Sequence, residues 1–162
     1  MGLDMYVRRV NKWDKKELST FVQKVLSSMS YAVNSESPTF DIDTFLQTNP
    51  TVNIPYGLGE ELCYWRKHPD LHGWMENLFY VKGGESESGF NHDTVFLTKE
   101  DVLSLKSDIE SKKLPQTTGF FFGESYADEE DIKWRNEHDM KCIEDMLKAL
   151  ENGDSIYYSS SW

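Results

Sequence analysis

The two ends of this chain carry β-strand patterns, and they constrain the fold more than any other feature. Residues 3–10 alternate loosely between apolar and polar side chains and are rich in β-forming residues. Residues 156–162 have a similar character and close the sequence. We predict that these two strands pair with each other. Because a chain of 162 residues without internal repeats fits one domain, residues 1–162 are expected to form a single domain.

The region between these strands has mainly helical patterns. Asp14, with Glu17 three residues later, predicts the capped start of a helix whose apolar stripe runs to about Tyr31 and belongs to the core. Further helices are expected at residues 41–46, at 59–67, from Pro69 onward, after an N-cap at Thr98, and from about 127 to 151. A short strand is expected at 94–97, and the glycine-rich segment 82–91 is expected to be a hairpin tip or a lid. The predicted fold is α+β: a helix-rich single domain with a small antiparallel sheet that includes the N- and C-terminal strands.

Charge excludes one broad class of function. The formal net charge is −11, and residues 124–154 contain eleven acidic and four basic side chains. Binding to duplex nucleic acid needs a broad basic surface, which this balance does not favour. The remaining partners are a protein with a basic surface or a small anionic ligand.

Targeting signals are not evident. The longest uncharged stretches fall far short of a membrane span, so no membrane partner is expected. The first residues lack a secretory pattern, which favours a cytoplasmic location. Cys63 and Cys142 are then expected to be buried free thiols.

A small island of aromatic and basic residues is the first candidate site. An aromatic face can stack on a base while a neighbouring guanidinium binds a phosphate, which suits a nucleotide-like anion. The candidate ligand-binding residues are Tyr64, Trp65, Arg66, Lys67, His72 and Trp74. On a helix, Tyr64 and Arg66 would not easily face one pocket. The alternative interpretation places Trp65 and Trp74 in the core and Arg66 in a structural salt bridge.

The segment 117–123 is the second candidate site. It contains three successive phenylalanines, which cannot all be buried on one face of a strand, so at least one is expected to contact another element, a ligand or a partner. Thr118, Gly119 and Phe121 are the candidate ligand-binding residues here. The alternative is a buried connection beneath a helix.

The start of the last helix is a candidate partner-binding surface. Its carboxylates favour the positive end of the helix dipole, so part of this acidic run has a structural explanation. The candidate partner-binding residues are Asp128, Glu129, Glu130, Trp134 and Glu137. Metal binding and catalysis are weaker interpretations. His68 and His72 are separated by Pro69 and lack a fourth ligand, and no catalytic signature is present, so we predict no metal, no cofactor and no catalytic residues.

Four blocks of this sequence resemble a family of small, uncharacterised proteins of bacteriophages and bacteria. They are Met-Gly-Leu-Asp-Met-Tyr at 1–6, Glu-Leu-Cys-Tyr-Trp-Arg-Lys at 61–67, Leu-Pro-Gln-Thr-Thr-Gly-Phe-Phe-Phe-Gly at 114–123, and Tyr-Tyr-Ser-Ser-Ser-Trp at 157–162. Some members carry a phosphoglycerate kinase label, which this chain does not support because it is too short and lacks a phosphate-binding loop. The resemblance implies a protein of phage or bacterial origin, and we expect it to be phage-encoded.

Two functions follow as hypotheses. The first is a noncatalytic acidic interaction protein that binds and modulates or inhibits a host or defence protein. The second is a protein that binds a small nucleotide-like anion, or a weak enzyme, with residues 64–67 as its pocket and the segment from Gly83 to Gly89 as a lid. Convergence of Tyr64, Arg66 and the segment 119–123 on one pocket would favour the second function.

Overall fold

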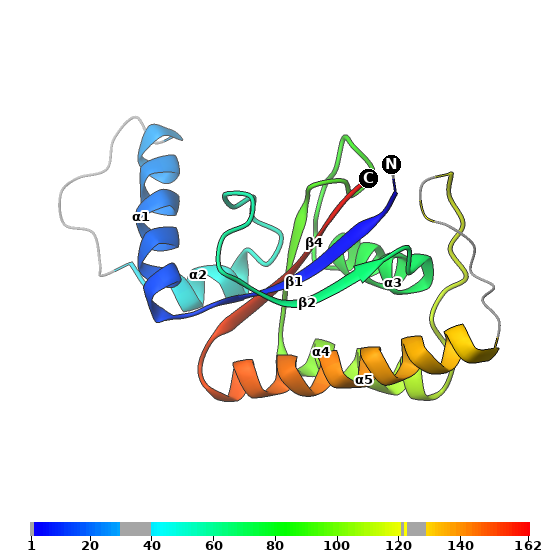
Figure 1. Ribbon diagram of the computed structural model, residues 1–162. Coiled ribbons are helices and arrows are strands. Elements are labelled where there is room, and N and C mark those ends of the chain that lie inside the picture. The colour runs from blue at the N-terminus through cyan, green and yellow to red at the C-terminus, as the bar shows by residue number, and fades with distance from the viewer. Residues whose placement is uncertain (1, 30–39, 121, 123–128) are drawn as a thin grey trace.

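The sheet has the two terminal strands at its centre. The computed structural model describes residues 2–29, 40–120, 122 and 129–162. Within these residues, four strands form an antiparallel sheet in the order β2-β1-β4-β3, with the bounds β1 (Asp4–Val10), β2 (Glu60–Arg66), β3 (Thr94–Leu97) and β4 (Ser155–Ser161). The predicted pairing of the opening and closing strands is confirmed, because every residue of β1 has a partner in β4 (Figure 1).

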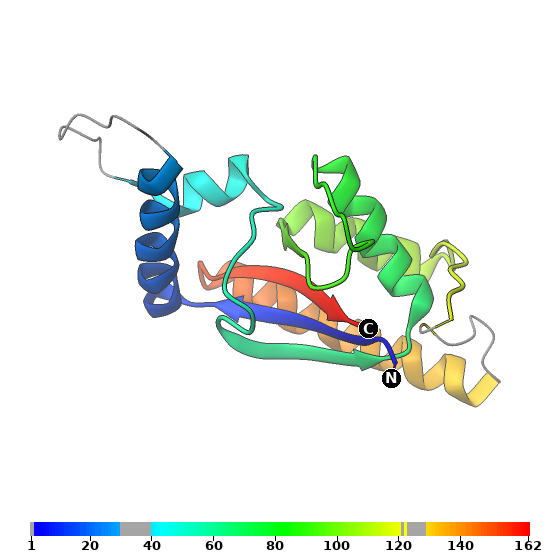
Figure 2. The same cartoon turned by 90° about the horizontal axis from the view of Figure 1, so that it is seen from above.

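Helices make up the rest of the regular structure. They are α1 (Lys12–Met29), α2 (Ile42–Thr48), α3 (Pro69–Val81), α4 (Lys99–Glu110) and α5 (Glu129–Glu151). In both views α1 and α2 stand together at one end of the molecule, whereas α3, α4 and α5 lie alongside the sheet (Figures 1 and 2). The protein therefore has the predicted α+β fold, rich in helix and with a small antiparallel sheet.

The two faces of the sheet contribute to different cores. The inner face, which carries Met5, Val7 and Tyr158, packs in a large apolar cluster with α3, α4 and α5. The outer face carries Phe96 and Tyr157, which belong to a second cluster with α1 and α2. Side chains alternate between the faces along each strand, so β1, β3 and β4 contribute residues to both cores, whereas β2 contributes only to the first.

Local signals set the helix ends at several predicted positions. Thr98 and Asp101 form a reciprocal capping box at the start of α4, and Pro69 is the first residue of α3. The end of α5 is also as predicted: Gly153 has a φ of 82°, and the N–H of Asp154 donates to the carbonyl of Ala149 over 3.1 Å.

The start of α1 differs from the prediction. Asn11, rather than Asp14, caps this helix: its side-chain Oδ1 accepts hydrogen bonds from the N–H groups of Trp13 and Asp14, over 2.8 and 3.1 Å. Asp14 instead occupies the second position of a capping box, because its side chain accepts a hydrogen bond from the N–H of Asn11. The helix therefore begins at Lys12, one turn earlier than expected, because an aspartate can fill either position of a capping box.

The apolar stripe of α1 is only partly core. Leu18 and Val22 are buried, but Val25 and Leu26 are each 40% exposed and Met29 is 77% exposed. The core interpretation is confirmed for Leu18 and Val22 and wrong for the rest of the stripe toward the end of the helix, which extends away from the sheet (Figure 1).

The predicted helix over residues 59–67 is wrong, because this segment is strand β2. Cys63 and Trp65 are buried while Tyr64 and Arg66 are exposed, an alternation with a period of two residues. Pairing with β1 supplies the backbone hydrogen bonds that a helix would have made locally. As a result Tyr64 and Arg66 lie on the same face, which removes the objection that a helix would separate them.

The segment after α3 is not a hairpin tip, because it joins a helix to β3. Phe90 within it is fully buried, and the N–H of His92 donates to the carbonyl of Ser160 over 2.9 Å. These contacts tie the end of the segment to the central strand β4. Cys63 and Cys142 are both buried and free, as predicted.

Candidate functional site

The N-terminal half of α5 is largely exposed. Its first buried side chain is Asp139, ten residues after the helix begins. Of the predicted partner-binding residues, Glu129, Glu130, Trp134 and Glu137 all have exposed side chains here. Asp128 lies outside the described residues.

Trp134 is exposed but held in place. Its side chain is 64% exposed, and its ring stacks on His138 with an interplanar angle of 4° and a centroid distance of 5.3 Å. His138 Nε2 donates to the carbonyl oxygen of Tyr64 over 2.9 Å, which fixes the imidazole against β2. His138 also meets the ring of Trp65 edge to face. The exposed indole is thus supported by a chain of contacts that reaches the core.

Carboxylates surround this indole. Glu130 lies one turn before Trp134 and Glu137 nearly one turn after it, so all three share one side of the helix. Glu137 forms a long ion pair of 4.0 Å with Lys133, and both side chains are well exposed. Such a pair contributes little to stability, so these charges are available to a partner.

A buried carboxylate anchors α5 below this surface. Asp139 accepts hydrogen bonds from Trp65 Nε1 over 2.8 Å and from His68 Nε2 over 3.0 Å. His68 Nδ1 accepts from the N–H of Leu71 over 3.4 Å, so both ring nitrogens are engaged. Since a general base needs a free nitrogen, this arrangement is structural and joins α5, β2 and α3.

The residues of the predicted ligand pocket point in two directions. Trp65 and His72 are buried on the inner side of the molecule, and Trp74 Nε1 donates to Asp108 over 2.9 Å. Tyr64, Arg66 and Lys67 are instead exposed. In the described part of the chain Arg66 forms no ion pair, so the predicted structural salt bridge is not found there. The island is divided between the core and the surface.

His72 lies in an aromatic part of the core. Its Nδ1 lies 2.8 Å from the hydroxyl of Tyr158, and its ring contacts Phe90 and Phe122. Burial lowers the pKa of His72 to about 4, so the imidazole is neutral near pH 7. No described residue is a hydrogen-bond partner of its Nε2. This position suits packing and not ligand binding at the surface.

Thr117, at the start of the second candidate site, packs on α3. A Cβ added to Gly73 would lie 1.9 Å from Thr117 Oγ1, so only glycine allows this approach. Thr118 and Gly119 are exposed, and Phe121 lies outside the described residues. Phe122 contacts both His72 and Trp162, which confirms that at least one phenylalanine of this block meets another element.

Three cavities of about 880, 280 and 210 Å³ are lined by described residues, and none of the three is lined by Tyr64, Arg66 or Gly119. The convergence that would favour the predicted ligand pocket is therefore not seen in these cavities. The cavity of about 280 Å³ lies beside Asp139 and His68, and Arg135 contributes to its wall.

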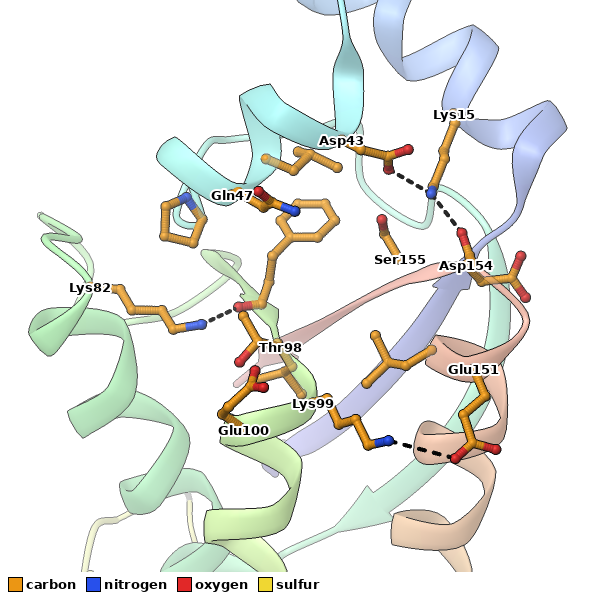
Figure 3. A pocket seen from close by; sticks show the side chains of 16 residues that line it. Lys15, Asp43, Gln47, Lys82, Thr98, Lys99, Glu100, Glu151, Asp154 and Ser155 are labelled. Carbon is orange, nitrogen blue, oxygen red and sulfur yellow. Dashed lines mark hydrogen bonds and ion pairs between the residues drawn. The ribbon is translucent and has the colours of Figure 1, made fainter.

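The cavity of about 880 Å³ is a groove between α2, the start of α4 and the end of α5, and sequence reasoning missed it (Figure 3). Its lysines are paired. Lys15 Nζ lies 2.6 Å from Asp43 and donates to the carbonyl of Gly153 over 2.8 Å. Lys82 Nζ donates to the carbonyl of Phe96 over 2.7 Å, and Lys99 lies 3.8 Å from Glu151. The groove is held together by these internal contacts.

The described residues offer neither a metal site nor a membrane-spanning helix. They contain no group of three or more His, Cys, Asp or Glu side chains arranged to hold a metal ion. They also contain no helix with the length and apolar character needed to cross a membrane. Comparison of the chain with protein-family models, curated proteins and solved structures found no match.

Proposed function

We propose that this protein is a noncatalytic interaction protein that binds a basic surface of another protein through the first half of α5. The observation that carries the proposal is the state of Trp134, which is 64% exposed yet stacked on His138. Tryptophan is enriched among the residues that dominate binding energy at interfaces. An anchor that is already ordered also loses less conformational entropy on binding.

The charge around this anchor supports a basic partner. Glu130 and Glu137 flank the indole, and the chain as a whole has a net charge of −11. Complementary charge increases the rate of association and excludes acidic partners. The resemblance to phage proteins supports the finer proposal that the partner is a host or defence protein whose activity is modulated or inhibited.

The test is a comparison of two exposed tryptophans. The full chain and the variants Trp134→Ala and Trp13→Ala are used to capture proteins from host lysate, and the affinity for each captured protein is then measured by titration. Trp13 is 70% exposed on α1 and serves as the matched control. We expect Trp134→Ala to weaken binding by at least about 2 kcal/mol, or about 30-fold, and Trp13→Ala to leave it unchanged.

Charge reversal is a second test of the same surface. Glu130→Lys with Glu137→Lys is expected to slow association, whereas Glu85→Lys with Glu87→Lys, on a different segment, is not. Equal binding by all of these variants would show that the first half of α5 is not the interface.

A further inference from the structure

The outer face of the sheet carries a row of polar and aromatic side chains that crosses all four strands. Tyr64 is paired with Tyr6, Tyr6 with Ser159, and Ser159 with Thr94. Directly paired residues of an antiparallel sheet share a face, so these four side chains lie side by side. The rings of Tyr6 and Tyr64 are 5.3 Å apart. This row lies on the opposite face of the sheet from α5.

A cavity opens over the Thr94 end of this row. Tyr56 and His92 meet edge to face at 5.8 Å and form its outer side, while Thr94, Tyr157 and Ser159 line it from the sheet. The side chain of Tyr56 is 67% exposed. His92 has a φ of 66°, a conformation that is uncommon outside glycine and that concentrates at functional sites.

The floor of this cavity offers a free polar group. Ser159 is only 5% exposed, yet within the described part of the chain its hydroxyl has no hydrogen-bond partner. The neighbouring hydroxyls are occupied, because Tyr157 donates to the carbonyl of Leu58 over 2.6 Å and Thr94 to the carbonyl of Val52 over 2.8 Å. Because Ser159 lines the cavity, its hydroxyl can donate a hydrogen bond to a ligand or accept one from it.

The size of the cavity limits what can enter. Its volume is about 210 Å³. That is somewhat more than a cavity of about 150 Å³ that holds benzene, and less than the about 300 Å³ at which pockets for drug-sized ligands begin. A single planar ring system fits, while any attached group must remain outside.

A cation lies next to the cavity. Arg8 is paired with Tyr157 across the strands, and its guanidinium carbon lies 5.2 Å from the centre of the Tyr6 ring. Its ion pair with Glu61 is long, at 4.0 Å, and the Arg8 side chain is 18% exposed. An arginine held beside aromatic rings can bind a phosphate with two hydrogen bonds.

From these observations we infer that this cavity binds the base of a nucleotide. The ring lies between Tyr56 and the sheet, with the Ser159 hydroxyl at one of its polar edges and the phosphate at Arg8. A base has polar edges and a π-face and is joined to an anion, which matches these three features better than an apolar side chain does. The site is distinct from the α5 surface.

The test is a titration of the full chain, labelled with ¹⁵N, with AMP, GMP, CMP and UMP and with single-stranded hexanucleotides of each base. We expect saturable shifts of the amides around Tyr56, His92 and Ser159 with at least one base, at a Kd below about 1 mM. Binding of the monophosphate alone identifies a free nucleotide as the ligand. Tighter binding of the hexanucleotide identifies a single strand.

Variants test whether the nucleotide binds at this cavity. Tyr56→Ala changes an exposed side chain and is expected to weaken binding about tenfold or more through the loss of stacking. Ser159→Val and Arg8→Gln are expected to weaken it as well, whereas Tyr80→Ala, a 45% exposed tyrosine on α3, and Trp134→Ala are not. No saturable shift with any probe, or equal affinity in Tyr56→Ala and the unaltered chain, would overturn the inference without affecting the proposed role of Trp134.

Discussion

Individual polar side chains in this core depend on contacts between residues that are far apart in the sequence. Asp139 is 2% exposed and is satisfied by Trp65 and His68, which lie more than 70 residues before it. Removing one partner of such a group leaves an unpaired polar atom in the interior, which is the costly outcome. Trp65 is therefore a core residue that orients α5.

His72 makes the stability of the protein depend on pH. Its pKa is lowered by burial from an ordinary 6.5 to about 4, so the unfolded chain binds the proton more readily. The stability contributed by the neutral imidazole is complete above about pH 6.5 and is lost as the pH falls toward 4. We expect the free energy of unfolding to fall by roughly 3 kcal/mol over this range on account of His72.

Urea unfolding at several pH values measures this effect. The variant His72→Phe should be less stable above about pH 6.5, because Tyr158 loses its partner, but its stability should change less between pH 6.5 and 4. An unchanged pH dependence in this variant would show that His72 is not the group responsible.

At the scale of elements, helix ends are set by local sequence signals. The secondary structure of a short segment such as β2 is instead set by the strand that lies beside it. Thr98 and Asp101 identify the start of α4 because all partners of a capping box lie within one turn. Strand β2 carries no such local signal. It is a strand because β1 offers an unpaired edge, and only then do Tyr64 and Arg66 share a face.

The corrected cap of α1 can be tested directly. Asn11→Ala removes an acceptor for two backbone N–H groups and is expected to destabilise the protein by about 1 kcal/mol in thermal or urea unfolding. Glu17→Ala is the matched control, because Glu17 would belong to the capping box only if Asp14 were the N-cap. If Glu17→Ala lowers the free energy of unfolding and Asn11→Ala does not, Asp14 and not Asn11 is the N-cap of α1.

At the scale of the whole molecule, polar contacts of one lysine join the two ends of the fold. Lys15 on α1 reaches both Asp43 on α2 and the Gly153 carbonyl in the turn between α5 and β4 (Figure 3). Its side chain is 11% exposed, so these contacts are shielded from water. Lys15 thereby holds one side of the groove of about 880 Å³ in place.

Replacing Lys15 tests this link. Lys15→Met keeps the apolar stem but leaves the Gly153 carbonyl without its donor, and we expect a loss of about 1–3 kcal/mol in the free energy of unfolding. The neighbouring Lys16 is exposed, and Lys16→Met is expected to change stability by less than about 0.5 kcal/mol. Equal effects of the two substitutions would contradict the role of Lys15.

The sequence by itself determined the features whose causes are local. These are the β character of both ends, the cap at Thr98, the end of α5 at Gly153, and the exposed acidic start of α5. Periodicity and capping act within a few residues, so they can be recognised without the fold.

Only the tertiary structure decided which side chains meet. It placed Tyr64 beside Tyr6, Ser159 beneath Tyr56, and His138 under Trp134. His138 could have been found, because it lies four residues after Trp134 on a predicted helix. The other two placements depend on strand pairing and on the path of the segment before β2, which are set by the burial of apolar surface across the whole chain and leave no local pattern.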